Sequence, residues 1–361
     1  MKFLIDINHP AHVHYFRNMI KIMENNGHQF RILSRNKEIE HYLLIKYKID
    51  FFSRGAGKKS TIGKIGYFFY ATFFLLKQLI KFKPAMVISF GTPYPAIAGK
   101  ILGIPHISIN DTEHAQMHHL LTDPFSNIIL TPTCYTKDLG NKQIRFNGYM
   151  ELSYLQKKYF RPDDSILKLL NINERQKFIV FRFVSWNAVH DLGHNGITLK
   201  NKIKAVKEFS KYARVFISSE SELPGELKKY KIDFPPERMH DVLAFATLFY
   251  GESATMASEC ACLGTPAIYL DNDGRGYTDE EEDKYGLVFN YSESEKDQLL
   301  SINKGIELLK NENIKKDWQK KTETMISDKI DVTAFFVWFF ENYPSSGKIL
   351  KENPDYQLKF N

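Results

Sequence analysis

Residues 251–268 read GESATMASECACLGTPAI, and they follow the apolar run ATLFY at 246–250. The segment predicts a Gly-Ser-Thr loop after a strand, then a helix of small residues that stops at Gly-Thr-Pro, then another strand. A helix that only packs in a core more often carries Leu and Ile. The small residues therefore indicate a place where a ligand or a neighbouring strand comes close.

The alternation of strand and helix continues on both sides of this segment. Strands are predicted at 2–7, 29–35, 86–91 and 106–111, and a second series starts at 178–184 after a polar linker. This order is typical of parallel sheets covered on both faces. We expect an α/β chain with two doubly wound Rossmann-like domains facing a cleft. The expected parts are an N-terminal Rossmann-like domain at 1–160, a C-terminal Rossmann-like domain at 161–325, and a C-terminal helix with a loosely held tail at 326–361. One alternative for this helix is that it packs back on the N-terminal domain.

Bulk composition narrows the class of protein. The 361 residues suit about two domains, and the net charge of +7 suits anionic small molecules or an anionic membrane face rather than nucleic acid. Three cysteines are too few for a disulfide scaffold. The longest apolar run, 67–76, is too short to cross a bilayer. We expect a cytoplasmic protein, with the inner face of the membrane as an alternative place.

The loop and helix at 251–263 have the chemistry of an anion site. Gly251 allows a sharp turn, Ser253 and Thr255 can cap the helix, and Ala254 leaves space for a ligand. Free N–H groups at a helix start attract phosphate. Glu259 lies one residue too far from Thr255 for a capping box, so another role is open to it. The alternative is a helix that is simply well packed.

The segment 251–268 resembles the nucleotide-sugar donor motif of GT-B glycosyltransferases such as the MurG-like enzymes, and that of the UDP-N-acetylglucosamine 2-epimerases. The whole chain resembles the DUF354 family, through IDINHPAHVHYFRNMIK (5–21), KPAMVISFGTPYPAIAGKILGIPHISINDTEHA (83–115) and 251–268. The resemblance implies GT-B architecture, with an acceptor domain at 1–160 and a nucleotide-sugar donor domain at 161–325. It also implies that Ser253, Ala254 and Thr255 receive a diphosphate and that Glu259 binds ribose. Glu252 departs from the pattern, because a carboxylate repels a diphosphate.

Further candidates follow other predicted strands. In the first domain, His12 and Asp111 are candidate bases with Glu113 beside them, whereas His14, Gly91 and Thr92 are candidate acceptor-binding residues. The alternative for His12, His14, Asp111 and Glu113 is a position at a helix start without a catalytic role. In the second domain, Arg182 and Arg275 are candidate phosphate ligands, Trp186 can stack, and His190 or His194 can face a ligand. The acidic run 280–283 is expected to be a solvated helix face.

The helix predicted at 62–83 combines phenylalanines with flanking lysines. The favoured interpretation is a buried helix whose lysines reach out to solvent. The alternative, a helix at the membrane interface, stays open, and MurG-like enzymes use such a patch to reach lipid-linked acceptors.

Together these features predict a glycosyltransferase of bacterial surface-glycan (polysaccharide) assembly. It would move sugar from a nucleotide diphosphate sugar, UDP-linked for example, to a glycan or lipid-linked acceptor, with no cofactor and no metal. The first alternative is a UDP-sugar 2-epimerase-like enzyme, hydrolysing or non-hydrolysing, in which Asp111 and Glu113 move protons. The second is a non-catalytic nucleotide-sugar-binding protein.

Overall fold

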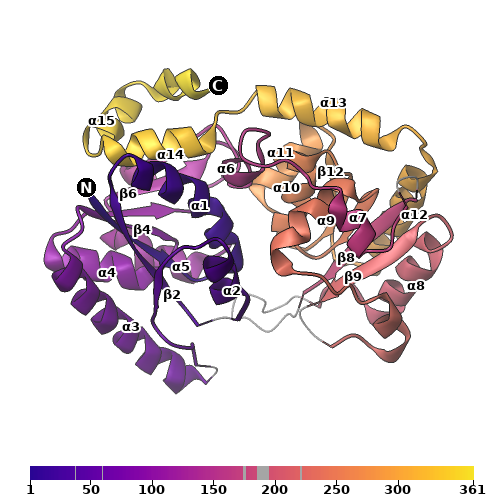
Figure 1. Ribbon diagram of the computed structural model, residues 1–361, viewed down its shortest axis with the longest axis horizontal. Coiled ribbons are helices and arrows are strands. Elements are labelled where there is room, and N and C mark those ends of the chain that lie inside the picture. The colour runs from indigo at the N-terminus through magenta and orange to yellow at the C-terminus, as the bar shows by residue number, and fades with distance from the viewer. Residues whose placement is uncertain (37, 59, 174–175, 185–194, 220–221) are drawn as a thin grey trace. The chain divides into compact units, whose positions relative to one another are not determined.

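The computed structural model describes residues 1–36, 38–58, 60–173, 176–184, 195–219 and 222–361. The chain forms two compact units: unit 1 is residues 1–154 with 329–361, and unit 2 is residues 155–328. Each unit is built around its own parallel sheet (Figure 1). Within the described residues, no helix has both the length and the apolar character needed to cross a bilayer.

Unit 1 contains a seven-stranded sheet in the order β3-β2-β1-β4-β5-β6-β7, with every neighbouring pair parallel. Parallel strands buried on both faces are apolar throughout, and β1 fits this rule over most of its length. The strands are β1 (Lys2–Ile7), β2 (Gln29–Ser34), β3 (Phe51–Ser53), β4 (Met86–Phe90), β5 (His106–Ile109), β6 (Ile128–Pro132) and β7 (Gln143–Phe146).

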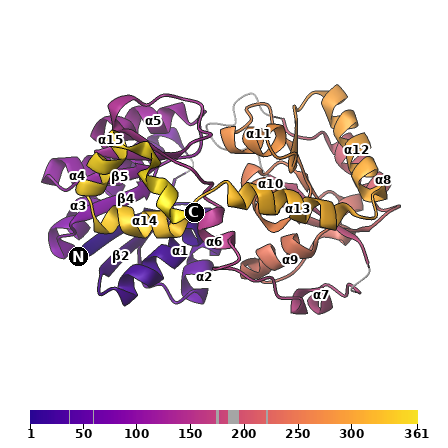
Figure 2. The same ribbon diagram turned by 90° about the horizontal axis from the view of Figure 1, so that it is seen from above.

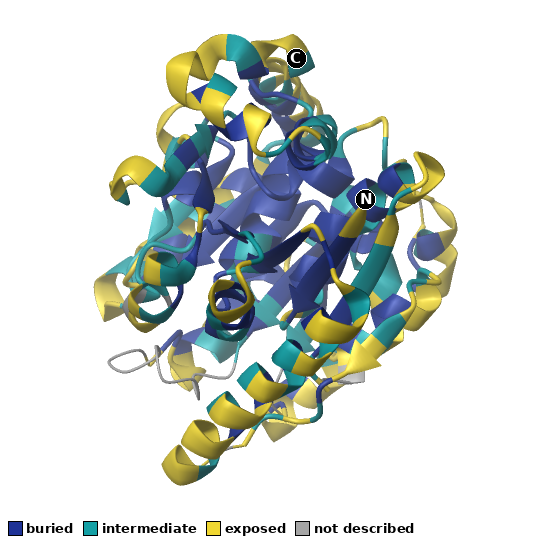
Figure 3. Ribbon diagram, turned by 90° about the vertical axis from the view of Figure 1, so that its left-hand side faces the viewer, coloured by how far each residue is buried: buried dark blue, intermediate teal, exposed yellow. Residues whose placement is uncertain are grey.

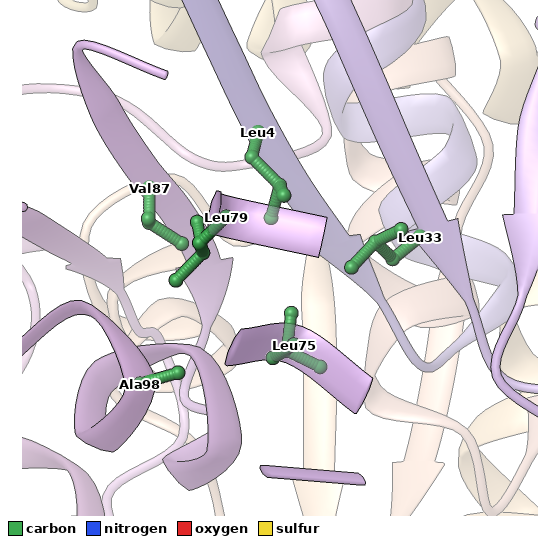
Figure 4. Packing of buried hydrophobic residues seen from close by; sticks show 6 residues of the cluster. All are labelled: Leu4, Leu33, Leu75, Leu79, Val87 and Ala98. Carbon is green, nitrogen blue, oxygen red and sulfur yellow. The ribbon is translucent and has the colours of Figure 1, made fainter. Parts of the chain in front are cut away.

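Helices cover both faces of this sheet. The helices of unit 1 are α1 (Pro10–Asn25), α2 (Glu38–Lys46), α3 (Thr61–Phe82), α4 (Pro93–Leu102), α5 (Gln116–Thr122), α6 (Leu152–Leu155), α14 (Val332–Glu341) and α15 (Ser345–Glu352), with 3-10 turns η1 (Asp123–Phe125), η2 (Gly140–Lys142) and η6 (Pro354–Phe360). Helices α3 and α4 pack together on one face. Figure 4 shows their core contact with the strands, made by Leu4, Leu33, Leu75, Leu79, Val87 and Ala98.

The chain returns to unit 1 at its C-terminal end. Helix α14 lies beside α1, as Figures 1 and 2 show. Helices α13 (Ile314–Ser327) and α14 are separate because the chain passes from unit 2 to unit 1 between them. The expectation of a loose tail was wrong: Gln357 is buried, its Oε1 accepts from the Asn147 N–H at 2.7 Å, and its Nε2 donates to the Arg145 carbonyl at 3.2 Å.

Unit 2 has a five-stranded parallel sheet in the order β12-β11-β10-β8-β9. Its strands are β8 (Phe178–Phe183), β9 (Arg214–Ser219), β10 (Leu248–Gly251), β11 (Ala267–Leu270) and β12 (Val288–Tyr291). Its helices are α7 (Ser165–Leu169), α8 (Leu199–Phe209), α9 (Met239–Phe245), α10 (Ala254–Leu263), α11 (Gly276–Asp283), α12 (Glu295–Lys310) and α13 (Ile314–Ser327), with turns η4 (Gly225–Tyr230) and η5 (Pro236–Arg238).

Both sheets reverse their strand order at one point. In unit 1 this point lies between β1 and β4, and in unit 2 it lies between β8 and β10. In open α/β sheets, the loops at the carboxyl ends of the strands on the two sides of such a point lead to opposite faces, and ligands bind in the crevice between them. The candidate site residues are therefore described at these two edges, one unit at a time.

Candidate functional site

Gly251 ends β10 at the reversal point of unit 2. It pairs with Arg182 on β8, and a Cβ atom on Gly251 would lie 2.3 Å from the Arg182 carbonyl oxygen. Glycine is thus required at position 251 because no space is left for a side chain. This corrects the expected reason, a sharp turn, because the φ angle of Gly251 is not in the left-handed region. The close pairing brings the Arg182 side chain to the same edge, where its Nη1 donates to Ser218 Oγ at 2.8 Å.

Helix α10 begins directly after this glycine. Ser253 is its N-cap and accepts a hydrogen bond from the Met256 N–H at 3.4 Å. Ala254 is buried and Thr255 is half-buried. Because the first N–H groups of a helix lack partners within the helix, the start of α10 is a suitable place for an anion. The predicted capping role of Ser253 matches this geometry, whereas Thr255 lies inside the first turn.

Glu252 departs from the expected donor loop, and its surroundings explain how the loop tolerates it. The carboxylate accepts from the Val184 N–H at 2.9 Å and from the Ile197 N–H at 2.6 Å, and it lies 3.1 Å from Lys202 Nζ. Burial raises the pKa of Glu252, and Lys202 with the two N–H groups opposes that shift. The negative charge is therefore balanced by its own partners, so Glu252 contributes little net repulsion to an anion.

Glu259 lies on α10 and is almost fully buried. Its Oε1 is 2.8 Å from Nε2 of His240, which is on α9. Sequence reasoning did not identify His240 as a partner, because the two residues belong to different helices. Ser258, the neighbour of Glu259 on α10, donates to the buried Glu281. The expectation that the run 280–283 is only a solvated face was therefore wrong at Glu281, which lies on α11 and is fully buried.

Arg275 stands at the N-cap position of α11, in the loop after β11. Its guanidinium donates to the Gly274 carbonyl and lies 3.7 Å from Asp271 Oδ2. The structure thus brings Arg182, Gly251, Ser253 and Arg275 to the carboxyl edge of one sheet. Trp186, His190 and His194 lie outside the described residues.

A buried polar network that sequence reasoning missed occupies the carboxyl edge of unit 1. Arg54 is fully buried: its Nε donates to Asp6 Oδ1 at 2.9 Å, its Nη2 to Asn8 Oδ1 at 2.9 Å, and its Nη1 to Tyr67 Oη at 2.6 Å. Asn8 in turn donates to the Thr92 hydroxyl. Burial raises the pKa of the Asp6 carboxyl, and Arg54 opposes that shift. The network fixes Asn8 and Thr92 at the reversal point.

His12 lies at the start of α1, beside this network. Its ring centroid is 4.6 Å from that of Phe90, the last residue of β4. Gly91 follows with φ +58°, and a Cβ atom there would be 3.7 Å from Asn110 Nδ2. His12, Gly91 and Thr92 therefore lie in one region. His14 lies apart from His12, because its ring stacks on Tyr154 and its Nδ1 is 3.5 Å from Tyr47 Oη.

Asp111 and Glu113 follow β5 at the same edge. Asp111 is buried, and its Oδ1 accepts from the Thr112 hydroxyl at 2.9 Å. Glu113 points toward the next loop, where its Oε1 accepts from the Thr136 N–H at 3.2 Å. Among the described residues, no group of three or more His, Cys, Asp or Glu side chains is arranged to hold a metal ion.

These two doubly wound units define a GT-B-fold protein, which confirms the predicted fold class. The particular family follows from a profile described as "Protein of unknown function (DUF354)", which matches residues 1–288. The chain belongs to this family, as its resemblance indicated. An uncharacterized protein of Methanocaldococcus jannaschii is 29% identical over 278 residues, which cover 73% of this chain and 80% of that protein.

Solved structures share the fold at low sequence identity. A putative UDP-N-acetylglucosamine 2-epimerase of Listeria monocytogenes has a TM-score of 0.65 at 12% identity, covering 88% of this chain and 90% of that one. The UDP-GlcNAc 2-epimerase of Methanocaldococcus jannaschii, in complex with UDP-GlcNAc and UDP, has a TM-score of 0.65 at 16% identity, covering 86% and 94%. Spinosyn rhamnosyltransferase SpnG, complexed with spinosyn aglycone, has a TM-score of 0.57 at 12% identity, covering 95% and 100%.

Proposed function

We propose that the protein is a glycosyltransferase that uses a nucleotide diphosphate sugar and acts in surface-glycan assembly. The observation that carries this proposal is the edge of unit 2, where Gly251 and Ser253 start a helix of small residues between Arg182 and Arg275. Diphosphates bind at such helix starts because unpaired N–H groups and the helix dipole favour negative charge. The names of similar structures, which include complexes with UDP-sugars, support a nucleotide sugar as the ligand.

Unit 2 would bind the donor through four contacts. The α10 start and Ser253 receive the diphosphate, Arg275 stabilises the leaving phosphate, and Glu259 accepts from ribose hydroxyls while His240 holds its carboxylate in place. Negative charge develops on the leaving diphosphate, and hydrogen-bond donors that are already in position stabilise it. Such electrostatic stabilisation is usually the largest single contribution to catalysis. No cofactor and no metal is needed for these steps.

Unit 1 would bind the acceptor through Gly91 and Thr92. A base is needed to remove the proton of the acceptor hydroxyl as the sugar is transferred. Asp111 is the first candidate because its carboxylate is buried and held by Thr112. His12 is the second, because its ring lies against Phe90 and next to Gly91.

The acceptor proposal extends to lipid-linked glycans because of α3. This helix buries Tyr67, Ala71, Leu75 and Leu79, and leaves the opposite side exposed. We call the exposed apolar residues the α3 outer stripe: Ile62, Ile65, Phe69, Phe73 and Ile80. The interpretation as a buried helix thus holds for one side only. Figure 3 shows the outer side of this helix as largely exposed.

Charge favours an anionic membrane surface as the partner of this stripe. Residues 55–110 contain seven lysines and no Asp, Glu or Arg. Because the net charge is +7, the rest of the chain carries as many acidic as basic residues. The net positive charge is thus concentrated in residues 55–110. Lysines beside exposed Ile and Phe are typical of a helix that lies at a membrane interface. We therefore propose the cytoplasmic face of the membrane as the site of action.

A UDP-sugar 2-epimerase is the second candidate. It is favoured by the similar structures, several of which are named UDP-GlcNAc 2-epimerases and cover most of this chain. In that reaction Asp111 and Glu113 would move protons on the sugar and no acceptor would be required. Release of UDP together with an altered hexosamine, in the absence of acceptor, distinguishes this reaction from transfer.

The first experiment is a thermal-shift screen against UDP, GDP, CDP, TDP and their sugars. A ligand that binds only the folded state raises the melting temperature, so one nucleotide is expected to give a clear shift. Glu259→Gln should weaken the binding of that nucleotide by about tenfold or more, because a hydrogen bond to a charged group is lost. Gln can still accept from His240, so the fold is expected to remain.

The matched control is Glu226→Gln, which makes the same chemical change at an exposed position of η4 in unit 2. It should leave nucleotide binding unchanged. No shift with any nucleotide or nucleotide sugar would overturn the donor site. Binding without transfer or epimerisation would instead favour a nucleotide-sugar-binding protein.

A further inference from the structure

His119 on α5 lies outside the residues to which a role has been given, yet it contacts three separate segments of unit 1. Its Nδ1 is 2.9 Å from Asp123 Oδ2 on η1, and its Nε2 is 2.9 Å from Tyr135 Oη after β6. The same Nε2 is 3.2 Å from the carbonyl oxygen of Thr112, in the loop between β5 and α5. The ring is mostly buried, so water competes little for these contacts.

The Thr112 contact depends on a proton. A carbonyl oxygen only accepts, so Nε2 must carry hydrogen to bond to it. Asp123 keeps hydrogen on Nδ1. The bare Nε2 of a neutral ring would accept from the Tyr135 hydroxyl at 2.9 Å or from Asn110 Nδ2 at 3.3 Å, but it would repel the lone pairs of the Thr112 carbonyl oxygen. Only the imidazolium, with hydrogen on both nitrogens, satisfies Asp123 and Thr112 together.

Thr112 connects this ring to the candidate base. Its backbone N–H donates to Asn110 Oδ1 at 3.0 Å, and its hydroxyl donates to Asp111 Oδ1 at 2.9 Å. We propose that His119 is a positioning residue: the imidazolium holds the Thr112 carbonyl, and through Thr112 it orients the Asp111 carboxylate. The role assigned to Asp111 rests on the proposed function, whereas the anchoring of the loop by His119 does not.

The electrostatic surroundings agree with a protonated ring. Burial lowers the pKa of His119, but the hydrogen bond and charge of Asp123 outweigh burial, the Thr112 carbonyl adds to their effect, and the pKa is raised. The other groups that bear on this site are Lys137, which opposes protonation, Asp111 and Glu113 on the loop, and Tyr135, whose own pKa is raised by burial and by these carboxylates. Arg145 on β7 donates to the Tyr135 carbonyl.

The sign of the pH dependence follows from the raised pKa. The anchor is complete below the unfolded value of about 6.5, and it is lost as pH rises through the higher pKa of the folded protein. Asp123→Asn removes the charge that favours the imidazolium, so it should move the loss to lower pH.

The test measures two quantities on the full chain across pH: the titration of the His119 ring by NMR, assigned with His119→Gln, and hydrogen exchange of the Thr112 and Glu113 amides. Exchange, corrected for its intrinsic pH dependence, should become about tenfold faster as His119 loses its proton, because a charged hydrogen bond is lost. Asp123→Asn should shift both curves down in pH together. The control Asp50→Asn, at an exposed position, should shift neither.

If the hydrogen exchange of the Thr112 and Glu113 amides in the wild type does not follow the titration of His119, His119 does not anchor this loop. This result is decisive whether or not Asp123→Asn folds. Where transfer or epimerisation is detected, kcat should fall over the same pH range while the KM for the nucleotide sugar stays constant. If the hydrogen exchange of the loop amides follows the titration of His119 but kcat does not, the positioning of Asp111 by His119 is overturned. Absence of any activity counts against the proposed function and leaves the exchange result to decide on His119.

Discussion

Arg182 and Gly251 are neighbours on the paired strands β8 and β10. The backbone of Arg182 occupies the space that a side chain at position 251 would need. The Arg182 carbonyl oxygen, nitrogen and carbonyl carbon would all lie within 3.0 Å of a Cβ atom on Gly251. Backbone atoms in the middle of a sheet cannot move aside as the end of a long side chain can. This single position therefore sets how closely β8 and β10 approach below the start of α10.

Gly251→Ala should destabilise unit 2 by about 2 kcal/mol, because overpacking against backbone forces the strands apart. For a unit of this size, that lowers the melting temperature by about 4–8 °C. Gly225→Ala is the control, since a Cβ atom there meets nothing within 4 Å. Equal melting temperatures of the two variants, measured by calorimetry, would show that the strands have room to adjust.

At this scale the sequence reveals residue types better than it reveals partners. Gly251, Ser253 and Asp111 were predicted because each follows an apolar strand, and strand ends are recognisable. Arg54 was not predicted, because SRGAG has the composition of an ordinary loop and Asp6 stands 48 positions away. His240 and Glu259 were missed as a pair for the same reason: nothing in local periodicity brings two helices together.

Helix α3 has two apolar stripes, and the sheet covers only one of them. The buried stripe repeats every four residues from Tyr67 to Leu79 and packs on the strands (Figure 4). The described residues of unit 1 do not cover the outer stripe in this way, and Phe69 and Phe73 are 68% and 59% exposed. Lys77 lies over the Phe73 ring with its Nζ 4.8 Å from the centroid. Aromatic rings beside lysine suit the boundary between lipid headgroups and acyl chains.

The double variant Phe69→Ser with Phe73→Ser should lose most binding to vesicles that contain an anionic phospholipid. Burying two phenylalanines is worth about 3–6 kcal/mol, so affinity should fall by at least about tenfold even with partial insertion. The melting temperature should change little, because both rings are already exposed. Co-sedimentation with vesicles at low and high salt measures the effect.

Leu300→Ser is the control for this pair, since Leu300 is an exposed apolar residue on α12 of unit 2. It should bind vesicles as the wild type does. If the wild-type protein does not bind anionic vesicles at low salt, the membrane is not the partner of α3. Periodicity alone could not assign this partner, because both sides of the helix are apolar and only the packed structure shows which side the sheet leaves uncovered.

The whole molecule is divided unevenly along the chain. Unit 2 is continuous, whereas unit 1 needs residues 329–361 to complete it. The apolar run at 332–340 predicts a buried helix, but hydropathy does not say what the helix packs against. Phe335 and Phe336 pack on Phe146 of β7, and the Thr333 hydroxyl donates to the Ser153 carbonyl at 2.6 Å. These contacts explain why α13 and α14 are separate helices.

A chain of residues 155–328 should therefore fold alone and bind the same nucleotide as the full protein, with an affinity within about threefold. Every donor-site residue assigned above, from Arg182 to Arg275, lies within this segment, and so do the helices α8 to α13. Calorimetry checks for cooperative unfolding, and the shift with nucleotide checks for the site.

A chain of residues 1–328 is the complementary variant. It lacks four fully buried phenylalanines of α14 and exposes the residues they pack against, and the burial of each phenylalanine is worth about 1.5–3 kcal/mol. That loss is comparable to the stability of a typical domain, so the transition of unit 1 should disappear while the nucleotide-dependent transition of unit 2 remains. A segment 155–328 that unfolds without cooperativity, or a full chain that binds a nucleotide when this segment does not, would mean that the donor site needs unit 1.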